Sequence, residues 1–165
     1  MTAEQELLSR AALTAFRLNG QFLGLAERLA RPVGLTAARW QVLGAVLREP
    51  LTVAGIARAM GITRQSVQRL ADLLEAEGLA EYVPNPSHRR AKLLRATESG
   101  YAAVRAIDPA HAVAARRLAA ELGPEELARA VDALAALSGA LDEMEPVDPV
   151  DPVDTRDALD AGASP

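Results

Sequence analysis

Residues 56–74 carry the most restrictive pattern in the chain: two short amphipathic segments joined at Gly61. Both segments predict helices, because their apolar residues recur every three or four positions. The small residue Ala57 stands where two crossing helices come closest, and Gly61 can adopt the positive φ of a tight turn. The pattern therefore predicts a helix-turn-helix, with helices over about residues 52–60 and 63–77.

The second of these helices has an apolar face and a polar face. Val67, Leu70, Ala71 and Leu74 share the apolar face, which we expect to point inward, and no acid occurs from residue 63 to 71. Arginine can bond guanine with two hydrogen bonds, glutamine can do the same with adenine, and hydroxyls can hold phosphates. An ordinary solvated helix, the alternative, would usually carry more Glu and Lys. We therefore predict a DNA-reading surface made of Thr63, Arg64, Gln65, Ser66, Gln68 and Arg69.

Two short strand patterns follow, at residues 79–83 and 92–96, joined by a loop rich in proline and basic residues. They predict a β hairpin, the wing of a winged helix-turn-helix. Arg89 and Arg90 stand at its tip, where their side chains can enter the narrow minor groove of A·T-rich DNA. A solvated loop is the alternative. Lys92 and Arg95 are expected on the returning strand, where they would contact phosphates.

Long helices are expected on both sides of this unit. Apolar spacing predicts helices over residues 3–30, about 35–48, 97–122 and from about 123 to 143. Aromatic residues make up only 3 % of the chain, and Ala and Leu dominate, which favours helices over sheets. The fold class is therefore mainly α: a winged helix-turn-helix with a wing of two or three strands. We expect one domain over residues 1–145, with its core at about 35–100 and terminal helices at about 3–30 and 97–144.

The charge is unevenly distributed along the chain. The net charge is −4, yet residues 34–97 hold nine Lys and Arg against five acids, and residues 98–165 hold five Arg against fourteen acids. The middle of the chain is therefore basic, as nucleic-acid binding requires. At residues 146–154 Pro-Val-Asp occurs three times. Because proline blocks helices and sheets, we expect residues 146–165 to be a disordered acidic tail. Autoinhibition, in which its acids compete with DNA for the basic face, is the alternative.

Several classes of protein are excluded. The chain has no cysteine, which rules out disulfides, thiolate metal sites and thiol redox chemistry. Its two histidines lie far apart, so we expect no metal site, and no cofactor is implied. There is no phosphate-binding loop and no nucleophile-elbow motif, so we expect that the protein is not an enzyme. Its acidic start and the lack of a long apolar run predict a cytoplasmic protein that does not contact membranes.

Residues 35–100 resemble the MarR family of bacterial transcription regulators. The similarity is carried by LTAARWQVLGAVL, IARAMGITRQSVQRLADLLEAEGLAEYV and NPSHRRAKLLRATESG. Asn85 and His88 replace acids that are usual in the family's wing, and Ala96 replaces a common leucine. In the family, the acid beside the tip arginine helps to orient that arginine. The resemblance implies a sequence-specific DNA-binding regulator. A winged-helix protein-interaction module or antirepressor that has lost DNA binding is the alternative.

The resemblance also implies a homodimer whose terminal helices interlock, so that two recognition helices meet a pseudo-palindromic operator on double-stranded DNA. The terminal helices support this independently, because their apolar residues form a stripe that needs a partner surface. Packing within one chain is the alternative, but the small winged unit cannot cover both ends. The residues of the stripe are Leu118, Leu122, Leu127, Val131, Leu134, Leu137 and Leu141.

Finally, the resemblance implies a small effector, often an aromatic or phenolic anion, that binds between the dimerisation and DNA-binding parts and releases DNA. We therefore expect a repressor that a small molecule relieves. Ordinary core or surface roles are the alternative for each candidate residue. The candidates for this ligand site are Phe16, Arg17, Phe22, Trp40 and His111.

Overall fold

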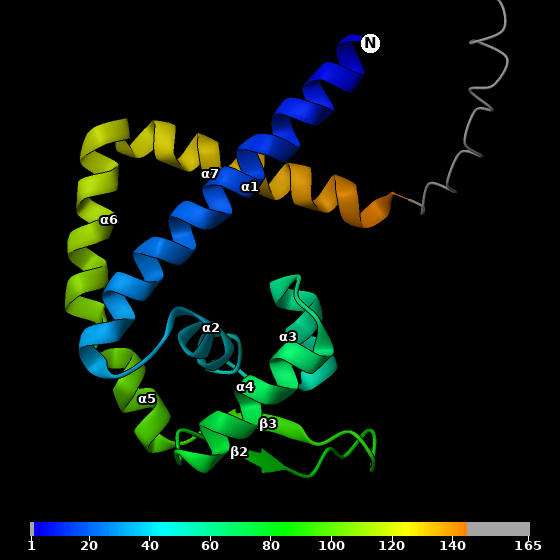
Figure 1. The fold of residues 1–165 in the computed structure, drawn as a ribbon, viewed down its shortest axis with the longest axis vertical. Helices are drawn as coiled ribbons and strands as arrows, with labels where there is room; N and C mark the ends of the chain where they lie inside the picture. Colours follow the sequence, from blue (N-terminus) through cyan, green and yellow to red (C-terminus); the bar gives the residue numbers. More distant parts are fainter. Residues whose placement is uncertain (1, 145–165) are drawn as a thin grey trace, which may run out of the picture. The chain divides into compact units, whose positions relative to one another are not determined.

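The computed structural model describes residues 2–144 and is mainly helical, with a small antiparallel sheet (Figure 1), which confirms the predicted fold class. The predicted acidic tail, residues 146–165, lies outside the described residues. The chain divides into two compact units, Met1–Arg117 and Leu118–Pro165. The elements are α1 Ala3–Ala30, the 3-10 turn η1 Arg31–Val33, α2 Ala37–Ala45, β1 Leu51–Thr52, α3 Val53–Met60, α4 Arg64–Ala76, β2 Ala80–Val83, β3 Leu93–Ala96, α5 Glu98–Arg105, α6 Asp108–Leu122 and α7 Pro124–Glu143.

The predicted helix-turn-helix is formed by α3 and α4. Each helix begins with a threonine cap: the Thr52 hydroxyl accepts from the Gly55 N–H at 3.0 Å, and the Thr63 hydroxyl accepts from the Ser66 N–H at 3.1 Å. Such caps satisfy backbone donors that have no partner within the helix. Gly61 ends α3 in the left-handed region, with φ at 64°. The prediction is therefore confirmed at both helices and at the turn.

The core of the winged unit lies between α2, α3, α4 and the sheet. Its largest fully buried side chains include Leu43, Ile56, Leu74 and Leu94. On α4, Val67, Ala71 and Leu74 are buried and Leu70 is half-buried against the same cluster, which confirms the apolar face predicted for this helix. The polar face of α4 is therefore held outward by burial of the opposite face.

The sheet has three strands in the order β1-β3-β2. In addition to the two strands of the hairpin, the sheet contains β1, in which Leu51 pairs with Leu94 and Thr52 with Leu93 of β3. To reach this position the chain leaves α2 at Ala45, although the sequence predicted a helix to about residue 48. The Tyr101 hydroxyl donates to the Leu47 carbonyl oxygen at 2.8 Å and holds this connection. The early end of α2 therefore follows from pairing with a distant strand, which the local sequence pattern does not encode.

The single helix predicted over residues 97–122 is wrong, because the structure has two helices there. α5 ends at Arg105, and α6 begins at Asp108. Pro109 explains the break: it has no backbone N–H, and its ring would clash with the carbonyl of Arg105 in a continuous helix. Ile107 is only 1 % exposed. The break therefore also places an isoleucine in the core.

The sheet meets α5 at a close backbone contact. The Thr97 N–H donates to the Leu79 carbonyl oxygen at 3.1 Å, and the Thr97 hydroxyl donates to the Gly78 carbonyl oxygen at 2.6 Å. Gly100, in the first turn of α5, is buried against the same segment. A Cβ atom at Gly100 would lie 2.0 Å from the Leu79 oxygen. Only glycine therefore fits at this position without moving the backbone.

Hydrogen bonds and an ion pair connect α1, α2 and the end of α4. The Ala37 N–H, at the start of α2, donates to Glu27 Oε2 of α1 at 2.8 Å. The Arg39 guanidinium donates to the Gly34 carbonyl oxygen at 2.8 Å and also bonds to the Glu77 carboxylate, just beyond α4. Its side chain is only 16 % exposed. The end of α1, the start of α2 and the end of α4 are therefore linked through three side chains, those of Glu27, Arg39 and Glu77.

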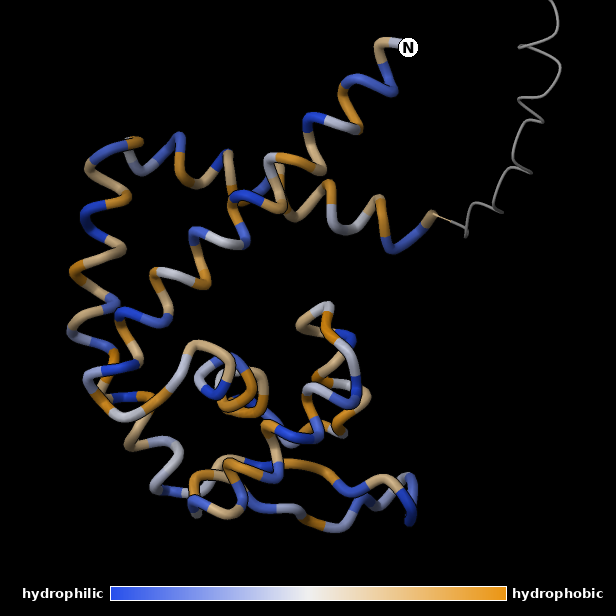
Figure 2. The backbone as a smooth tube through the Cα atoms, viewed as in Figure 1, coloured by the Kyte–Doolittle hydropathy of each residue, from blue (hydrophilic) through white to orange (hydrophobic). Residues whose placement is uncertain are grey.

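Apolar side chains remain exposed on the long helices. Apolar and polar residues alternate along α1 and α7 in Figure 2, as they do in amphipathic helices. None of the helices between residues 2 and 144 has the length and hydropathy that crossing a membrane requires. The exposed apolar side chains include Leu7, Leu8, Leu13, Phe16 and Phe22 on α1, Leu118 and Leu122 on α6, and Val131, Leu134, Leu137 and Leu141 on α7.

Candidate nucleic-acid interface

The N-terminal half of α4 presents long polar side chains to solvent. Arg64, Gln65 and Arg69 are all exposed. The hydroxyls of Thr63 and Ser66 are instead engaged with each other and with the helix start. The Thr63 hydroxyl caps the helix and also donates to Ser66 Oγ at 2.9 Å. These two hydroxyls shape the helix start, where backbone N–H groups can meet a phosphate. Arg64, Gln65 and Arg69 are therefore the side chains best placed to reach base edges.

Gln68 is exposed but engaged within the protein. Its Nε2 donates to Asp72 Oδ1 and to the Tyr82 hydroxyl oxygen, both at 2.8 Å, and the Tyr82 hydroxyl donates to Asp72 Oδ1 at 2.9 Å. Burial and, next, the hydrogen bond to Asp72 raise the pKa of Tyr82 to about 12. We call these three residues the α4–β2 clamp. The α4–β2 clamp was not predicted from the sequence, although Gln68 and Asp72 have the i, i+4 spacing of helical side-chain pairs.

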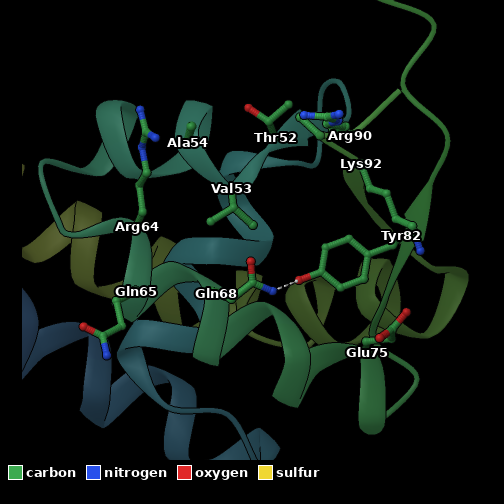
Figure 3. Close-up of a pocket in the computed structure, with 11 residues that line it drawn as sticks. Thr52, Val53, Ala54, Arg64, Gln65, Gln68, Glu75, Tyr82, Arg90 and Lys92 are labelled. Carbon is green, nitrogen blue, oxygen red and sulfur yellow. Dashed lines mark hydrogen bonds between the residues drawn. The ribbon is translucent and has the colours of Figure 1, made fainter. Parts of the chain in front are cut away.

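A groove of about 770 Å³ separates α4 from the wing (Figure 3). Basic side chains line it from both directions, with Arg64 on α4 and Arg90 and Lys92 on the hairpin. Glu75 is an acidic residue on the same lining. The structure therefore brings five of the predicted DNA-binding residues to one groove: Arg64, Gln65, Gln68, Arg90 and Lys92.

The hairpin tip projects its basic residues into solvent. Arg89 and Arg90 are exposed in the turn after His88, whose carbonyl oxygen accepts from the Ala91 N–H at 3.2 Å. Asn85 Oδ1 accepts from the Ser87 N–H at 3.0 Å. Asn85 replaces an acid that is usual in the family. Its side chain therefore stabilises the loop by bonding to the backbone two residues further on.

The returning strand carries Arg95 as predicted, but it does not include Lys92. Lys92 precedes β3 rather than lying on it. Arg95 lies directly opposite Glu81 in the sheet register and is bonded to it at 2.6 Å, so its guanidinium is engaged in a cross-strand ion pair. Register determines this pairing, and the sequence pattern did not specify register. Lys92 thus remains a candidate phosphate contact, whereas the half-exposed Arg95 already has a carboxylate partner with which a phosphate would have to compete.

Some basic side chains of the described residues are engaged in ion pairs, and the candidate DNA-binding cations are not. Arg39, Arg95, Arg105 and Arg129 each pair with a carboxylate. By contrast, five basic side chains of α4 and the wing make no ion pair with another residue in the range 2–144. Their charges are therefore available to phosphates or base edges. We call this set the basic surface: Arg64, Arg69, Arg89, Arg90 and Lys92.

Comparison with known proteins identifies the family. Residues 33–91, which include the helix-turn-helix, match the sequence model of the MarR family. An uncharacterised protein of Mycobacterium tuberculosis is 40 % identical over 134 residues, covering 81 % of this chain and 94 % of its own length. This chain belongs to the MarR family. It is therefore a DNA-binding transcriptional regulator.

Two further proteins that this chain resembles have known roles or ligands in their names. The transcriptional activatory protein BadR of Rhodopseudomonas palustris is 29 % identical over 102 residues, covering 59 % of this chain and 58 % of BadR. The crystal structure of CouR from Rhodococcus jostii, bound to p-coumaroyl-CoA, is 26 % identical and matches with a TM-score of 0.66. That match covers 84 % of this chain and 95 % of CouR. MarR-family regulators are non-enzymatic DNA-binding proteins.

The residues predicted to bind an effector in this MarR-family protein do not all come together. The rings of Trp40 and His111 meet edge to face, with their centroids 5.9 Å apart. Phe16 and Phe22 are 73 % and 50 % exposed, so the alternative that places them in the core of a single chain is wrong. Arg17 is also exposed on α1.

A second groove, of about 580 Å³, lies between α1 and α6 and contains none of these five residues. It combines apolar side chains with two arginines, Arg28 and Arg117, which the sequence analysis missed. Their position one helix turn from apolar residues such as Leu25 and Val113 was the available signal. The full lining is Leu25, Arg28, Leu29, Ala110, Val113, Ala114 and Arg117.

Proposed function

We propose that this MarR-family protein is a sequence-specific repressor that binds a pseudo-palindromic operator as a homodimer and has no catalytic activity. The basic surface carries the proposal, because its five cations lie on two elements that winged helices insert into DNA grooves. Arginines on α4 can read base edges, while the hairpin contacts the flanking backbone and minor groove. A protein that contacts chromosomal DNA in a bacterium acts in the cytoplasm.

Exposed apolar residues on the long helices support the homodimer. Leu13 is 68 % exposed on α1, and Leu137 and Leu141 are 51 % and 59 % exposed on α7. Helix faces of this kind are usually covered in a stable protein, and a second copy of the same chain is the commonest partner. A dimer also presents two recognition helices, which suits a pseudo-palindromic operator.

We infer repression because a dimer seated on a promoter blocks polymerase without any further contact surface, whereas activation needs one. BadR is named as an activatory protein, so the sign of regulation requires its own measurement. A reporter gene behind the protein's own upstream DNA should be less expressed when the protein is present. Higher expression would instead assign the protein as an activator.

Binding to the protein's own upstream DNA, measured at several salt concentrations, tests the proposed function. We expect a retarded complex whose affinity falls steeply as salt rises, because each phosphate contact releases counterions. Binding that ignores salt would contradict the basic surface. No binding to any duplex, together with capture of a partner protein, would favour the alternative of a winged-helix interaction module.

Replacing the two hairpin arginines should weaken binding most at A·T-rich flanks. We expect Arg89→Ala/Arg90→Ala to reduce affinity several-fold on such flanks, because the narrow minor groove concentrates negative potential there. The measurement compares operators that differ only in flank composition. Equal losses on A·T-rich and G·C-rich flanks would contradict minor-groove insertion and would instead indicate phosphate contacts.

We further propose that a small aromatic anion relieves repression by binding in the groove between α1 and α6. Apolar side chains there can cover an aromatic ring, while Arg28 and Arg117 can pair with a carboxylate or phosphate. CouR supports this choice of ligand, because its crystal structure contains p-coumaroyl-CoA. The candidates predicted from the sequence lie outside this groove and remain an alternative ligand site. They are the aromatic pair of Trp40 and His111, with Phe16, Arg17 and Phe22.

p-Coumarate and p-coumaroyl-CoA are suitable probes for this ligand site. We expect one of them to release the protein from DNA, and Arg28→Ala or Arg117→Ala to raise the required concentration roughly tenfold, because a charge-assisted hydrogen bond is lost. Arg116→Ala is the matched control, since Arg116 is exposed on α6 outside the groove. Equal effects at Arg116 and Arg117 would contradict the assignment.

A further inference from the structure

The amide orientation of Gln68 is determined by its neighbours. Its Nε2 lies 2.8 Å from Asp72 Oδ1, and a carboxylate oxygen can only accept a hydrogen bond. The nitrogen must therefore face Asp72. The second Nε2 hydrogen goes to the Tyr82 hydroxyl oxygen, also at 2.8 Å. Because an amide nitrogen carries two hydrogens, the clamp uses both.

The Tyr82 hydroxyl stabilises this arrangement. It accepts from Gln68 and donates its own hydrogen to Asp72 Oδ1 at 2.9 Å, so the three side chains form a closed triangle. A phenol keeps its hydrogen at neutral pH, and burial, which raises the pKa of Tyr82 to about 12, extends this to alkaline pH. Releasing the Gln68 amide would break two hydrogen bonds, including one to a carboxylate.

Only the acceptor of Gln68 remains for DNA. In Figure 3 the amide oxygen points away from Tyr82, and Gln68 lines the groove between α4 and the wing. A free glutamine reads adenine with two bonds, accepting from N6–H and donating to N7. With no donor left, Gln68 can only accept. Adenine N6 and cytosine N4 offer a hydrogen in the major groove, whereas guanine O6 and thymine O4 are acceptors.

We propose that Asp72 and Tyr82 determine specificity by making Gln68 an acceptor-only reader, which selects adenine or cytosine over guanine or thymine without separating the first two. This inference rests on the proposed DNA binding. Asp72 and Tyr82 act through Gln68 and are therefore positioning residues. A free glutamine would be expected to select adenine alone. With Asp72 and Tyr82 bonded to its amide nitrogen, Gln68 is instead expected to accept both adenine and cytosine.

Selection of bound duplexes from a randomised library by the full chain tests the proposal. For the wild type we expect one operator position where adenine and cytosine are enriched comparably, each about fivefold to tenfold over guanine and thymine. Gln68→Ala should flatten that position and leave the others unchanged. Tyr82→Phe frees one amide hydrogen, so the same position should shift to adenine over cytosine by about fivefold, because only adenine offers N7 beside its amine.

Two further variants keep the test decisive. Asp72→Ala also frees an amide hydrogen and should produce the same shift towards adenine. Tyr101→Phe, the matched control, removes a hydroxyl bonded to Leu47 outside the clamp and should leave the selected sequences unchanged. A wild type that already prefers adenine to cytosine, or a Gln68→Ala profile identical to wild type, would overturn the inference. Enrichment of no sequence at all would instead refute the proposed function.

Discussion

Gly100→Ala is expected to destabilise the folded protein by about 3 kcal/mol, at the upper end of the range for inserting one methyl group into a packed site. The new Cβ would lie 2.0 Å from the Leu79 carbonyl oxygen. That oxygen belongs to the backbone and also accepts from the Thr97 N–H, so it cannot move without loss of a hydrogen bond. Thermal unfolding at a fixed protein concentration should show a melting temperature lower by about 6–12 °C.

Gly44→Ala is the matched control for this substitution. Gly44 is exposed on α2, and a Cβ there would have no atom within 4 Å. We expect it to stabilise the protein by roughly 0.5–1 kcal/mol, because alanine loses less conformational entropy in a helix. If both variants melted at the wild-type temperature, the close contact between α5 and the segment before β2 would be contradicted.

Arg64→Ala and Arg69→Ala are each expected to cost about 1–3 kcal/mol of operator binding and to relax sequence preference at one position. Both arginines are exposed on α4 and make no ion pair with the described residues, so no internal partner restrains them. Affinities for operators that differ by single base pairs measure the effect. An arginine that contacts phosphate would instead show an equal loss on every sequence and a salt slope shallower by about one.

Arg105→Ala is the control for these arginines, because it removes the same charge from α5, where Arg105 pairs with Glu98 at 3.0 Å. We expect almost no change in DNA affinity at physiological salt, which screens distant charges. A loss as large as that of Arg64→Ala would show that total charge, rather than the position of the arginine, determines binding.

The helix-turn-helix could be predicted from sequence because its signals are local. Threonine caps, a glycine at the turn and one apolar face all lie within about 25 residues, and each agrees with the others. The break between α5 and α6 was also encoded locally, by Pro109, but the apolar spacing continued through it. Periodicity alone therefore gave one helix where proline required two.

Other parts of the site depend on contacts between distant residues. β1 has two residues, Leu51 and Thr52, and is a strand only because it pairs with β3. The clamp joins Gln68 to Tyr82, and the Arg95 ion pair depends on sheet register. The local pattern predicted exposed polar residues on α4 correctly, but it could not show which of them were already bonded.

The links from Glu27 to Ala37 and from Arg39 to Glu77 have a mechanical consequence for the recognition helix. Hydrogen bonds resist stretching, so a tilt of the end of α1 pulls on the start of α2, and Arg39 transmits that displacement to the end of α4. These contacts therefore couple the orientation of α4 to that of the end of α1. In the proposed complex with DNA, the angle of α4 in the major groove then depends in part on a long helix whose own residues need not touch the nucleic acid.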